Sequence, residues 1–239
     1  MGLLGKMFKP KVSGAEIEFE VQGRLLGTKS NVVILDVGAY VGEVARKYKK
    51  VFPQSTIHCF EPFPDSFAKL KEAYVDGAVM GYQIAISDKQ GKAKFCVNTD
   101  LSCNSLFPRP ENGFKYYAED SKNVQEIEVE TDTVDNFCDN ANIIAIDILK
   151  IDVEGAETKV LKGASKRLAN KQIKLIYAEV MFVKHYEGGC LFHEVADLLN
   201  CYGYSLLNLY NLKSAKNGQL RWGNAIFLSP EIRTMVEAT

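Results

Sequence analysis

The chain has 239 residues, 46% of them hydrophobic and 25% charged, and its formal net charge is −1. These values are close to the average for a soluble globular protein and give no sign of a disordered, collagen-like or coiled-coil chain. The near-neutral charge argues against a nucleic-acid partner, because such binding depends mainly on neutralising phosphates.

Short apolar runs alternate with amphipathic segments after an irregular, glycine-containing start. Continuous or alternating apolar patterns predict strands, and apolar residues three or four positions apart predict helices. The predicted strands cover residues 32–37, 56–60, 81–86, 93–97, 126–130, 146–153, 173–181, 204–209 and 225–228. The predicted helices cover residues 41–52, 65–74, 131–138, 157–168 and 191–202.

This order of elements predicts an α/β domain with a mostly parallel sheet and helices on both faces. We expect the domain to span residues 31–230, with a leader at 1–30 packed on its core and a tail at 231–239. The last two strands have no helical pattern between them, so they should form an antiparallel hairpin near one edge of the sheet. Ligands in such sheets bind beyond the carboxyl ends of the strands.

Residues 98–123 have no clear period, and the segment is too long for an idle connection in a compact domain. It could close over a site as a lid. Several of its aromatic residues could stack on a sugar, namely Phe107, Phe114, Tyr116 and Tyr117. The alternative is that the segment is disordered.

The six cysteines form no CxxC pair, so zinc-ribbon and thioredoxin-like sites have no support. Four of them lie in apolar segments, as reduced buried thiols do, which suits a reducing cytosol. No apolar run approaches the roughly 18 residues that span a bilayer, and the first residues lack the features of a secretory signal. We therefore expect a cytoplasmic protein without a membrane span.

The segment Asp36–Gly42, with the sequence DVGAYVG, links the first predicted strand to the first predicted helix. Gly38 can adopt backbone angles that are closed to other residues, which lets a ligand approach the turn. The N–H groups at the start of the helix suit an anionic group such as the carboxylate of an amino acid. Asp36 could hold an amine or an ordered water at the same place.

Glu61 ends the second predicted strand, 23 positions after Gly38. A carboxylate about 20 residues after such a turn accepts hydrogen bonds from ribose hydroxyls in this architecture. Pro62 then stiffens the turn that follows. The alternative interpretation is an ordinary helix-capping or surface glutamate.

The glycine turn does not suit a dinucleotide, because a pyrophosphate needs glycines where this chain has Tyr40 and Glu43. Tyr40 would crowd the phosphates, and Glu43 would repel them. S-adenosylmethionine has no phosphate, so it meets neither objection.

The segment Leu149–Glu157, with the sequence LKIDVEGAE, runs from a strand into a helix. Asp152 and Glu154 fall at the carboxyl end of this strand, where a carboxylate could attract a cation or act as a base on a hydroxyl. The alternatives are that Asp152 only caps the helix and that Glu154 only faces solvent. Glu179, near the end of the next predicted strand, and His185, just past that end, are further candidates, although a lone loop histidine is more often a surface residue.

The carboxylates Asp152, Glu154 and Glu179 could also bind magnesium through oxygen. Spacing along the sequence gives no ligand geometry, so we assign no metal ligands.

These segments together resemble the FkbM family of S-adenosylmethionine-dependent methyltransferases over roughly residues 31–210. The matching motifs are DVGAYVG at 36–42, FEP at 60–62, IAISD at 84–88, TDTVDNF at 131–137, LKIDVEGAETKVLKGA at 149–164, YAEV at 177–180 and CYGY at 201–204. The block at 149–164 is the most specific of them. Two positions depart from the family pattern: Gln83 stands where asparagine is frequent, and Asp132-Thr133 stands where Leu-Asp is more usual.

The resemblance implies a Rossmann-like class I methyltransferase fold, with a seven-stranded, mostly parallel sheet and a C-terminal antiparallel hairpin. It also implies S-adenosyl-L-methionine as the methyl donor and, usually, O-methylation of a sugar, glycan or small-metabolite hydroxyl. Carried onto this sequence, it gives cofactor contacts at Asp36, Gly38, Ala39, Tyr40, Glu61, Pro62, Ala85, Ile86, Ser87 and Asp152. The catalytic candidates remain Asp152, Glu154, Glu179 and His185.

Two other function classes stay open at this point. One is a non-catalytic module that binds S-adenosylmethionine without transferring its methyl group. The other is an NAD-dependent oxidoreductase, against which Tyr40 and Glu43 count. A nucleic-acid methyltransferase is disfavoured, because DVEG stands at 152–155 where amino-group methylators carry an Asp-Pro-Pro-Tyr type motif. The sequence identifies neither the individual acceptor nor the oligomeric state.

Overall fold

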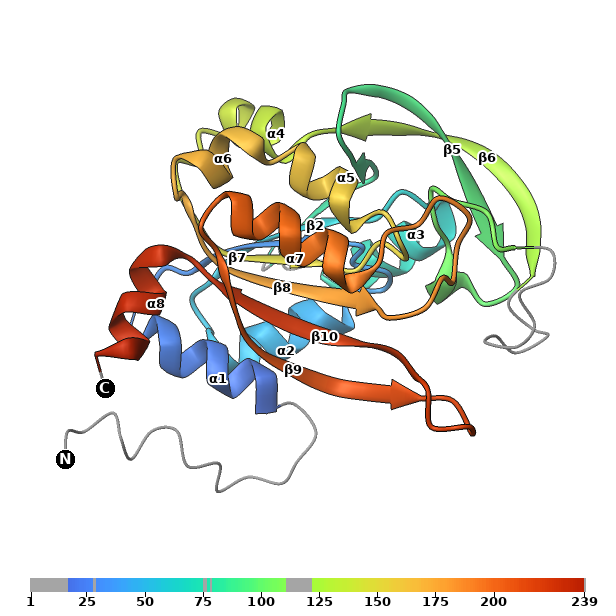
Figure 1. Ribbon diagram of the computed structural model, residues 1–239. Helices are drawn as coiled ribbons and strands as arrows, with labels where there is room; N and C mark the ends of the chain where they lie inside the picture. Colours follow the sequence, from blue (N-terminus) through green and yellow to red (C-terminus); the bar gives the residue numbers. More distant parts are fainter. Residues whose placement is uncertain (1–16, 28, 75–76, 78, 111–121, 239) are drawn as a thin grey trace.

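The computed structural model describes residues 17–27, 29–74, 77, 79–110 and 122–238. Seven strands form the main sheet: β1 (Val33–Val37), β2 (Thr56–Phe60), β3 (Met80–Tyr82), β7 (Ile146–Ile151), β8 (Ile173–Met181), β9 (Ser205–Ser214) and β10 (Leu220–Leu228). Their order is β3-β2-β1-β7-β8-β10-β9 (Figure 1). All neighbouring pairs are parallel except β8–β10 and β10–β9. The predicted seven-stranded, mostly parallel sheet with an antiparallel C-terminal hairpin is therefore confirmed.

Helices cover both faces of this sheet (Figure 1). They are α1 (Ile17–Leu26), α2 (Glu43–Val51), α3 (Pro64–Ala73), α4 (Val134–Asn140), α5 (Glu157–Lys162), α6 (Ser165–Ala169), α7 (Phe192–Cys201) and α8 (Pro230–Glu237). Side chains of α4, α5, α6 and α7 join one buried core, and side chains of α1, α2, α3 and α8 join another. Neighbouring strand residues divide between the two cores, with Leu149 in the first and Ile148 in the second, because successive side chains on a strand point to opposite faces.

The central strand β7 is buried along its whole length, including Asp147 and Lys150. Its β-branched and leucine side chains fit a strand that is covered on both faces. A charged residue in such a strand needs a partner, since an isolated buried charge is very costly. Lys150 therefore needs a charged or polar partner within the sheet.

A second, three-stranded sheet lies next to the end of the main sheet at which β8 terminates (Figure 1). It comprises β4 (Ala85–Ile86), β5 (Gly91–Asn98) and β6 (Asn123–Asp132), in the order β4-β6-β5. A short 3-10 helix, η2 (Leu101–Cys103), follows β5. The second sheet has a small core of its own, composed of Ala85, Phe95, Val97 and Val129.

The predicted strand at 81–86 is divided between the two sheets. Residues 80–82 form β3 at the edge of the main sheet, whereas residues 85–86 form β4 and pair with β6. The predicted helix at 157–168 is likewise divided, into α5 and α6. A Cβ on Gly163, which lies between them, would be 2.1 Å from the carbonyl oxygen of Ser87, so close packing of two chain segments explains this break.

Both ends of the chain are more regular than the sequence analysis predicts. Residues 1–16 lie outside the described residues, but 17–26 form α1 rather than an irregular leader. The ring of Phe19 packs edge-on against Tyr48, with centroids 5.0 Å apart, and this burial stabilises the helix. The predicted tail contains α8, which begins with a Ser229 cap and a proline in its first turn.

No helix among the described residues combines the length and apolar character that crossing a bilayer requires.

Candidate functional site

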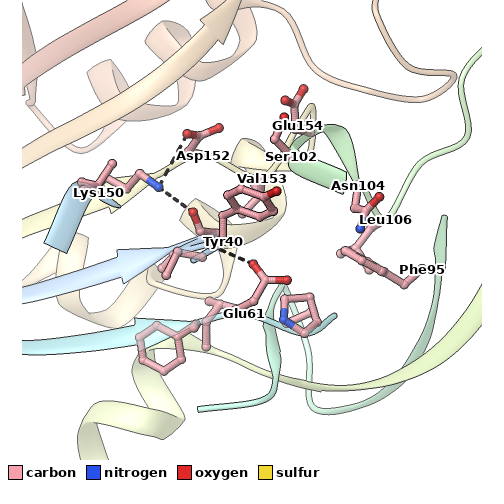
Figure 2. A pocket seen from close by; sticks show the side chains of 18 of the residues that line it. Tyr40, Glu61, Phe95, Ser102, Asn104, Leu106, Lys150, Asp152, Val153 and Glu154 are labelled. Carbon is pink, nitrogen blue, oxygen red and sulfur yellow. Dashed lines mark hydrogen bonds and ion pairs between the residues drawn. The ribbon is translucent and has the colours of Figure 1, made fainter. Parts of the chain in front are cut away.

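A pocket lies at the carboxyl ends of β1, β2 and β7, where the topology predicts a ligand. One side is formed by the turn after β1, by Glu61 and Pro62, and by the segment after β7. The other side is formed by residues 84–86, by Phe95 and by residues of η2 and the turn that follows it. Figure 2 shows these side chains around one cavity. Of the predicted cofactor contacts, those that line the pocket are Gly38, Ala39, Tyr40, Glu61, Pro62, Ala85, Ile86 and Asp152.

Gly38 is required by the protein's own packing. Its φ is +75°, and a Cβ there would lie 1.7 Å from the carbonyl oxygen of Asp152. The N–H groups of Gly38 and Ala39 both donate to the carbonyl oxygen of Phe60, at 3.0 Å. These two N–H groups are therefore engaged at the end of the sheet, and the helix-start N–H groups that are expected to suit a carboxylate are those of α2, which begins at Glu43.

Glu61 is nearly fully buried, which excludes the surface-glutamate alternative. Its Oε2 accepts a hydrogen bond from the Tyr40 N–H, and its Oε1 accepts one from the Phe63 N–H, both at 2.9 Å. Burial raises the pKa of Glu61 to about 7, against the effect of these two backbone donors. The carboxyl group is thereby fixed in the pocket wall, and each oxygen keeps a lone pair for a further donor.

Lys150 lines the pocket and was not a sequence-based candidate. Its Nζ is 2.9 Å from Asp36 Oδ1. It is also 3.6 Å from Asp152 Oδ2 and donates to the Gly38 carbonyl oxygen at 2.6 Å (Figure 2). Burial opposes its charge, but the neighbouring carboxylates of Asp36 and Asp152 outweigh burial and raise the pKa of Lys150. A lysine between Leu149 and Ile151 in a predicted buried strand is the signal that could have identified it.

Asp36 is fully buried and is not among the lining residues. It stands beside Lys150 because β1 and β7 pair in parallel with these two residues in register. The structure therefore places Asp36 as the partner of a buried cation that lines the pocket, whereas the sequence analysis expects a direct cofactor contact. Ser87 is also buried away from the lining, with its hydroxyl donating to Asp88.

Three of the four catalytic candidates lie together. Carboxylate oxygens of Asp152, Glu154 and Glu179 all lie within 4.8 Å of one another. Asp152 and Glu154 line the pocket, and Glu179 stands behind them on β8. Burial, and then the charge of Asp152, raises the pKa of Glu154 to about 8 and raises that of Glu179 as well. Like charges this close favour bound protons, and we assign no metal ligands.

The capping and solvent-facing alternatives for this segment are wrong. Helix α5 starts after Ala156, with no side-chain cap, so Asp152 does not cap it. Glu154 has a positive φ of 55° and faces the pocket rather than bulk solvent. A non-glycine residue in this strained region of the backbone is typical of functional sites.

Tyr186 is the second residue that the sequence analysis missed. Its hydroxyl oxygen is 2.7 Å from Glu154 Oε2 and 3.0 Å from the carbonyl oxygen of Cys103. The guanidinium carbon of Arg109 lies 4.1 Å from the centre of the Tyr186 ring. One hydroxyl proton cannot serve both acceptors fully, so the two contacts are best satisfied when Glu154 is protonated and donates to Tyr186.

His185 does not line this pocket, although it is next to Tyr186 in the chain. Its side chain is buried, and burial, followed by Arg221 and Arg109, lowers its pKa to about 3. The ring is therefore neutral at neutral pH. His58, on β2, is also buried, and its Nδ1 lies 3.1 Å from the Tyr82 hydroxyl.

The segment predicted as a lid contributes to the pocket through residues other than its aromatic ones. Leu101, Ser102, Asn104 and Leu106 line the cavity. Phe107 does not line it and packs instead on Gly188, where a Cβ would be 3.2 Å from the ring. Phe114, Tyr116 and Tyr117 lie outside the described residues.

Comparisons with known proteins agree with this geometry. Residues 36–206 match the family model described as the methyltransferase FkbM domain. The chain is 30% identical over 179 residues to the 2-O-methyltransferase NoeI of Sinorhizobium fredii, covering 72% of each chain. It is 31% identical over 196 residues to the 31-O-demethyl-FK506 methyltransferase FkbM of Streptomyces tacrolimicus, covering 73% of each chain.

Solved structures support the fold. The small RNA methyltransferase HEN1 superposes with a TM-score of 0.50 at 13% identity, covering 89% of this chain and 25% of that one. At this level of identity the likeness concerns only the fold.

Proposed function

The chain belongs to the FkbM methyltransferase family and is an S-adenosylmethionine-dependent methyltransferase, and we propose that it methylates a hydroxyl of a sugar, a glycan or a small metabolite. The observation that carries the proposal is the placement of two carboxyl groups, the buried Glu61 and the half-buried Glu154, in the wall of one pocket. The first suits a ribose, and the second suits an acceptor that must lose a proton.

The residues present fit S-adenosylmethionine. Glu61 can accept from both hydroxyls of a ribose while its backbone donors hold it still. Ala85, Ile86 and Phe95 offer an apolar wall to a flat base. Asp152 and Glu154 line the pocket, where their negative charge would attract a cationic group. Tyr40 and Glu43 line the same cavity, where they would oppose a pyrophosphate.

When bound, the cofactor supplies a methyl group on a positively charged sulfur. The pocket aligns this group with the acceptor, and such alignment supplies much of the rate enhancement of a displacement. Glu154 accepts the proton that the acceptor hydroxyl loses. Its pKa of about 8 suits this role, because a general base works best when its pKa is near the working pH.

The names of both relatives support an oxygen acceptor. NoeI is a 2-O-methyltransferase, and FkbM acts on 31-O-demethyl-FK506. A non-catalytic binding module would have no use for a carboxyl group beside the donor pocket whose pKa is raised to about 8. The placement of Glu154 therefore favours an enzyme.

Incubation with S-adenosylmethionine carrying a labelled methyl group tests the proposal. We expect label on a hydroxyl oxygen of one member of a panel of sugars, oligosaccharides and hydroxylated small molecules, identified by mass spectrometry. Glu154→Gln should bind S-adenosylhomocysteine like the wild type but transfer at least about 100-fold more slowly. Labelling confined to nitrogen or to RNA would contradict the proposal, and so would transfer by Glu154→Gln at the wild-type rate.

A further inference from the structure

Asn104 lies in the turn after η2, on the side of the pocket that carries Phe95 and Leu106 (Figure 2). The turn is firmly held. The Ser105 hydroxyl donates to the carbonyl oxygen of Glu154 at 2.7 Å, and Ser105 forms an isolated bridge with Cys96. Asn104 therefore projects from a fixed backbone that is joined to the carboxyl end of β7.

The amide of Asn104 has only one consistent orientation. The backbone N–H of Asn98 donates to Asn104 Oδ1 at 2.8 Å, and a backbone N–H can only be a donor. The oxygen must therefore face Asn98, and the NH2 group must take the other direction. This argument removes the usual ambiguity between the two ends of an asparagine amide.

The Nδ2 atom of Asn104 is buried and has no hydrogen-bond partner among the described residues. A buried donor without an acceptor is destabilising. Because Asn104 lines the pocket, a bound ligand is the natural source of the missing acceptor.

The surroundings of Asn104 specify the kind of ligand. Leu101, Leu106 and Phe95 are apolar, and Ala85 with Ile86 line the same part of the cavity wall. A flat, apolar slot with one polar group at its edge suits a heteroaromatic ring that accepts a hydrogen bond. In Figure 2, Asp152 lies away from Phe95, Asn104 and Leu106, and Glu154 lies beside Ser102, so the apolar residues are left to contact the base of the cofactor.

We propose that Asn104 binds the adenine ring of S-adenosylmethionine by donating a hydrogen bond from Nδ2 to a ring nitrogen. The inference rests on the cofactor of the proposed function and does not depend on the acceptor. It makes the turn at 104–106 part of the donor site, whereas the sequence analysis assigns residues 98–123 to a lid.

Calorimetry with S-adenosylhomocysteine, in the absence of any acceptor, tests this role. We expect Asn104→Ala and Asn104→Asp to weaken binding about 3- to 10-fold, the range for one neutral hydrogen bond. Asn104→Asp keeps an oxygen toward Asn98 and cannot donate, so it isolates the lost donor. Asn200→Ala, an exposed position on α7, is the matched control and should bind normally.

Analogues of S-adenosylhomocysteine that lack one ring nitrogen identify the bond without any change to the protein. Among the 1-, 3- and 7-deaza forms, one should bind wild type about 3- to 10-fold more weakly. That form should lose nothing further with Asn104→Ala. Equal binding of all forms by wild type, or unaltered S-adenosylhomocysteine binding by both variants, would overturn the assignment while leaving the proposed function intact. Failure of wild type to bind S-adenosylhomocysteine would overturn both.

Discussion

The hydroxyl oxygen of Tyr186 and the carboxyl oxygen Oε2 of Glu154 lie 2.7 Å apart. The direction of the hydrogen bond between them depends on whether Glu154 carries a proton. When Glu154 is protonated, it can donate to Tyr186, which can then donate to the Cys103 carbonyl oxygen. When Glu154 is ionised, Tyr186 must turn its single proton to the carboxylate. This exchange gives Tyr186 a role in setting when Glu154 can act.

The first prediction concerns the pH dependence of methyl transfer. Activity should rise with pH through about 8, because Glu154 must be ionised to accept a proton. In Tyr186→Phe the carboxylate loses a donor, so its pKa should rise by about one unit and the profile should move to higher pH. A profile of kcat against pH measures both effects. If the pH profile of the variant equals that of the wild type, Tyr186 does not influence the ionisation of Glu154.

The second prediction concerns stability. The pKa of Glu154 is raised to about 8 in the folded state, against a reference value of 4.5, so the folded protein binds more protons between these values. The contribution of Glu154 to stability is therefore lost as pH rises through this window. Replacing it with glutamine should stabilise the protein by about 2 kcal/mol at pH 9 and change little at pH 4. Urea unfolding at the two pH values checks the sign.

The third prediction concerns Lys150. Lys150→Met leaves Asp36 buried without its cation, and this should destabilise the fold by about 3–5 kcal/mol. The double variant Asp36→Asn/Lys150→Met should regain a large part of the loss, because the unpaired charge is gone. Urea unfolding of the single and double variants provides the measurement, and equal loss in both would show that Lys150 acts through packing alone.

The fourth prediction concerns Gly38. Gly38→Ala should prevent folding or cost well over 3 kcal/mol, since the new Cβ would meet the Asp152 carbonyl oxygen. Gly218→Ala is the matched control: its φ is +84°, but nothing lies within 4 Å of an added Cβ. That variant should cost only the backbone strain, about 1 kcal/mol. Thermal unfolding of the two variants would distinguish the steric clash of the new Cβ from the strain of the backbone conformation.

The fifth prediction concerns Glu61. Glu61→Ala should weaken S-adenosylhomocysteine binding at least about 10-fold, because the ribose loses a charged acceptor. It also leaves the N–H groups of Tyr40 and Phe63 without their acceptor, so a folded-state check by circular dichroism belongs with it. Glu61→Gln keeps an oxygen acceptor and should have a smaller effect. Unchanged affinity in the alanine variant would remove Glu61 from the donor site.

The sequence predicts those parts of the site that depend on strand ends. Glu61, Asp152 and Glu154 each follow a strongly apolar strand, and the parallel topology brings such ends to one edge of the sheet. Their separation along the chain does not matter once the strand order is known. The family resemblance, carried by the block at 149–164, supplies that order.

Lys150 and Tyr186 could not be predicted in the same way. The partner of Lys150 is set by the register of β1 against β7, which depends on the whole sheet rather than on any local pattern. Tyr186 lies 32 positions after Glu154, in the irregular segment that follows β8. The break between α5 and α6 could not be predicted for a related reason. It depends on the close approach of Gly163 to the backbone of Ser87, which only the folded chain creates.

The small core formed by Ala85, Phe95, Val97 and Val129 is separate from the two large cores on the two faces of the main sheet. One wall of the donor pocket is thus supported independently of the floor that holds Lys150. A change in the size of Phe95 would therefore alter the wall that faces the base of the cofactor and would act on this small core rather than on the two large ones. Asp36 and Lys150 tolerate no such change, because their ion pair joins the two neighbouring strands β1 and β7.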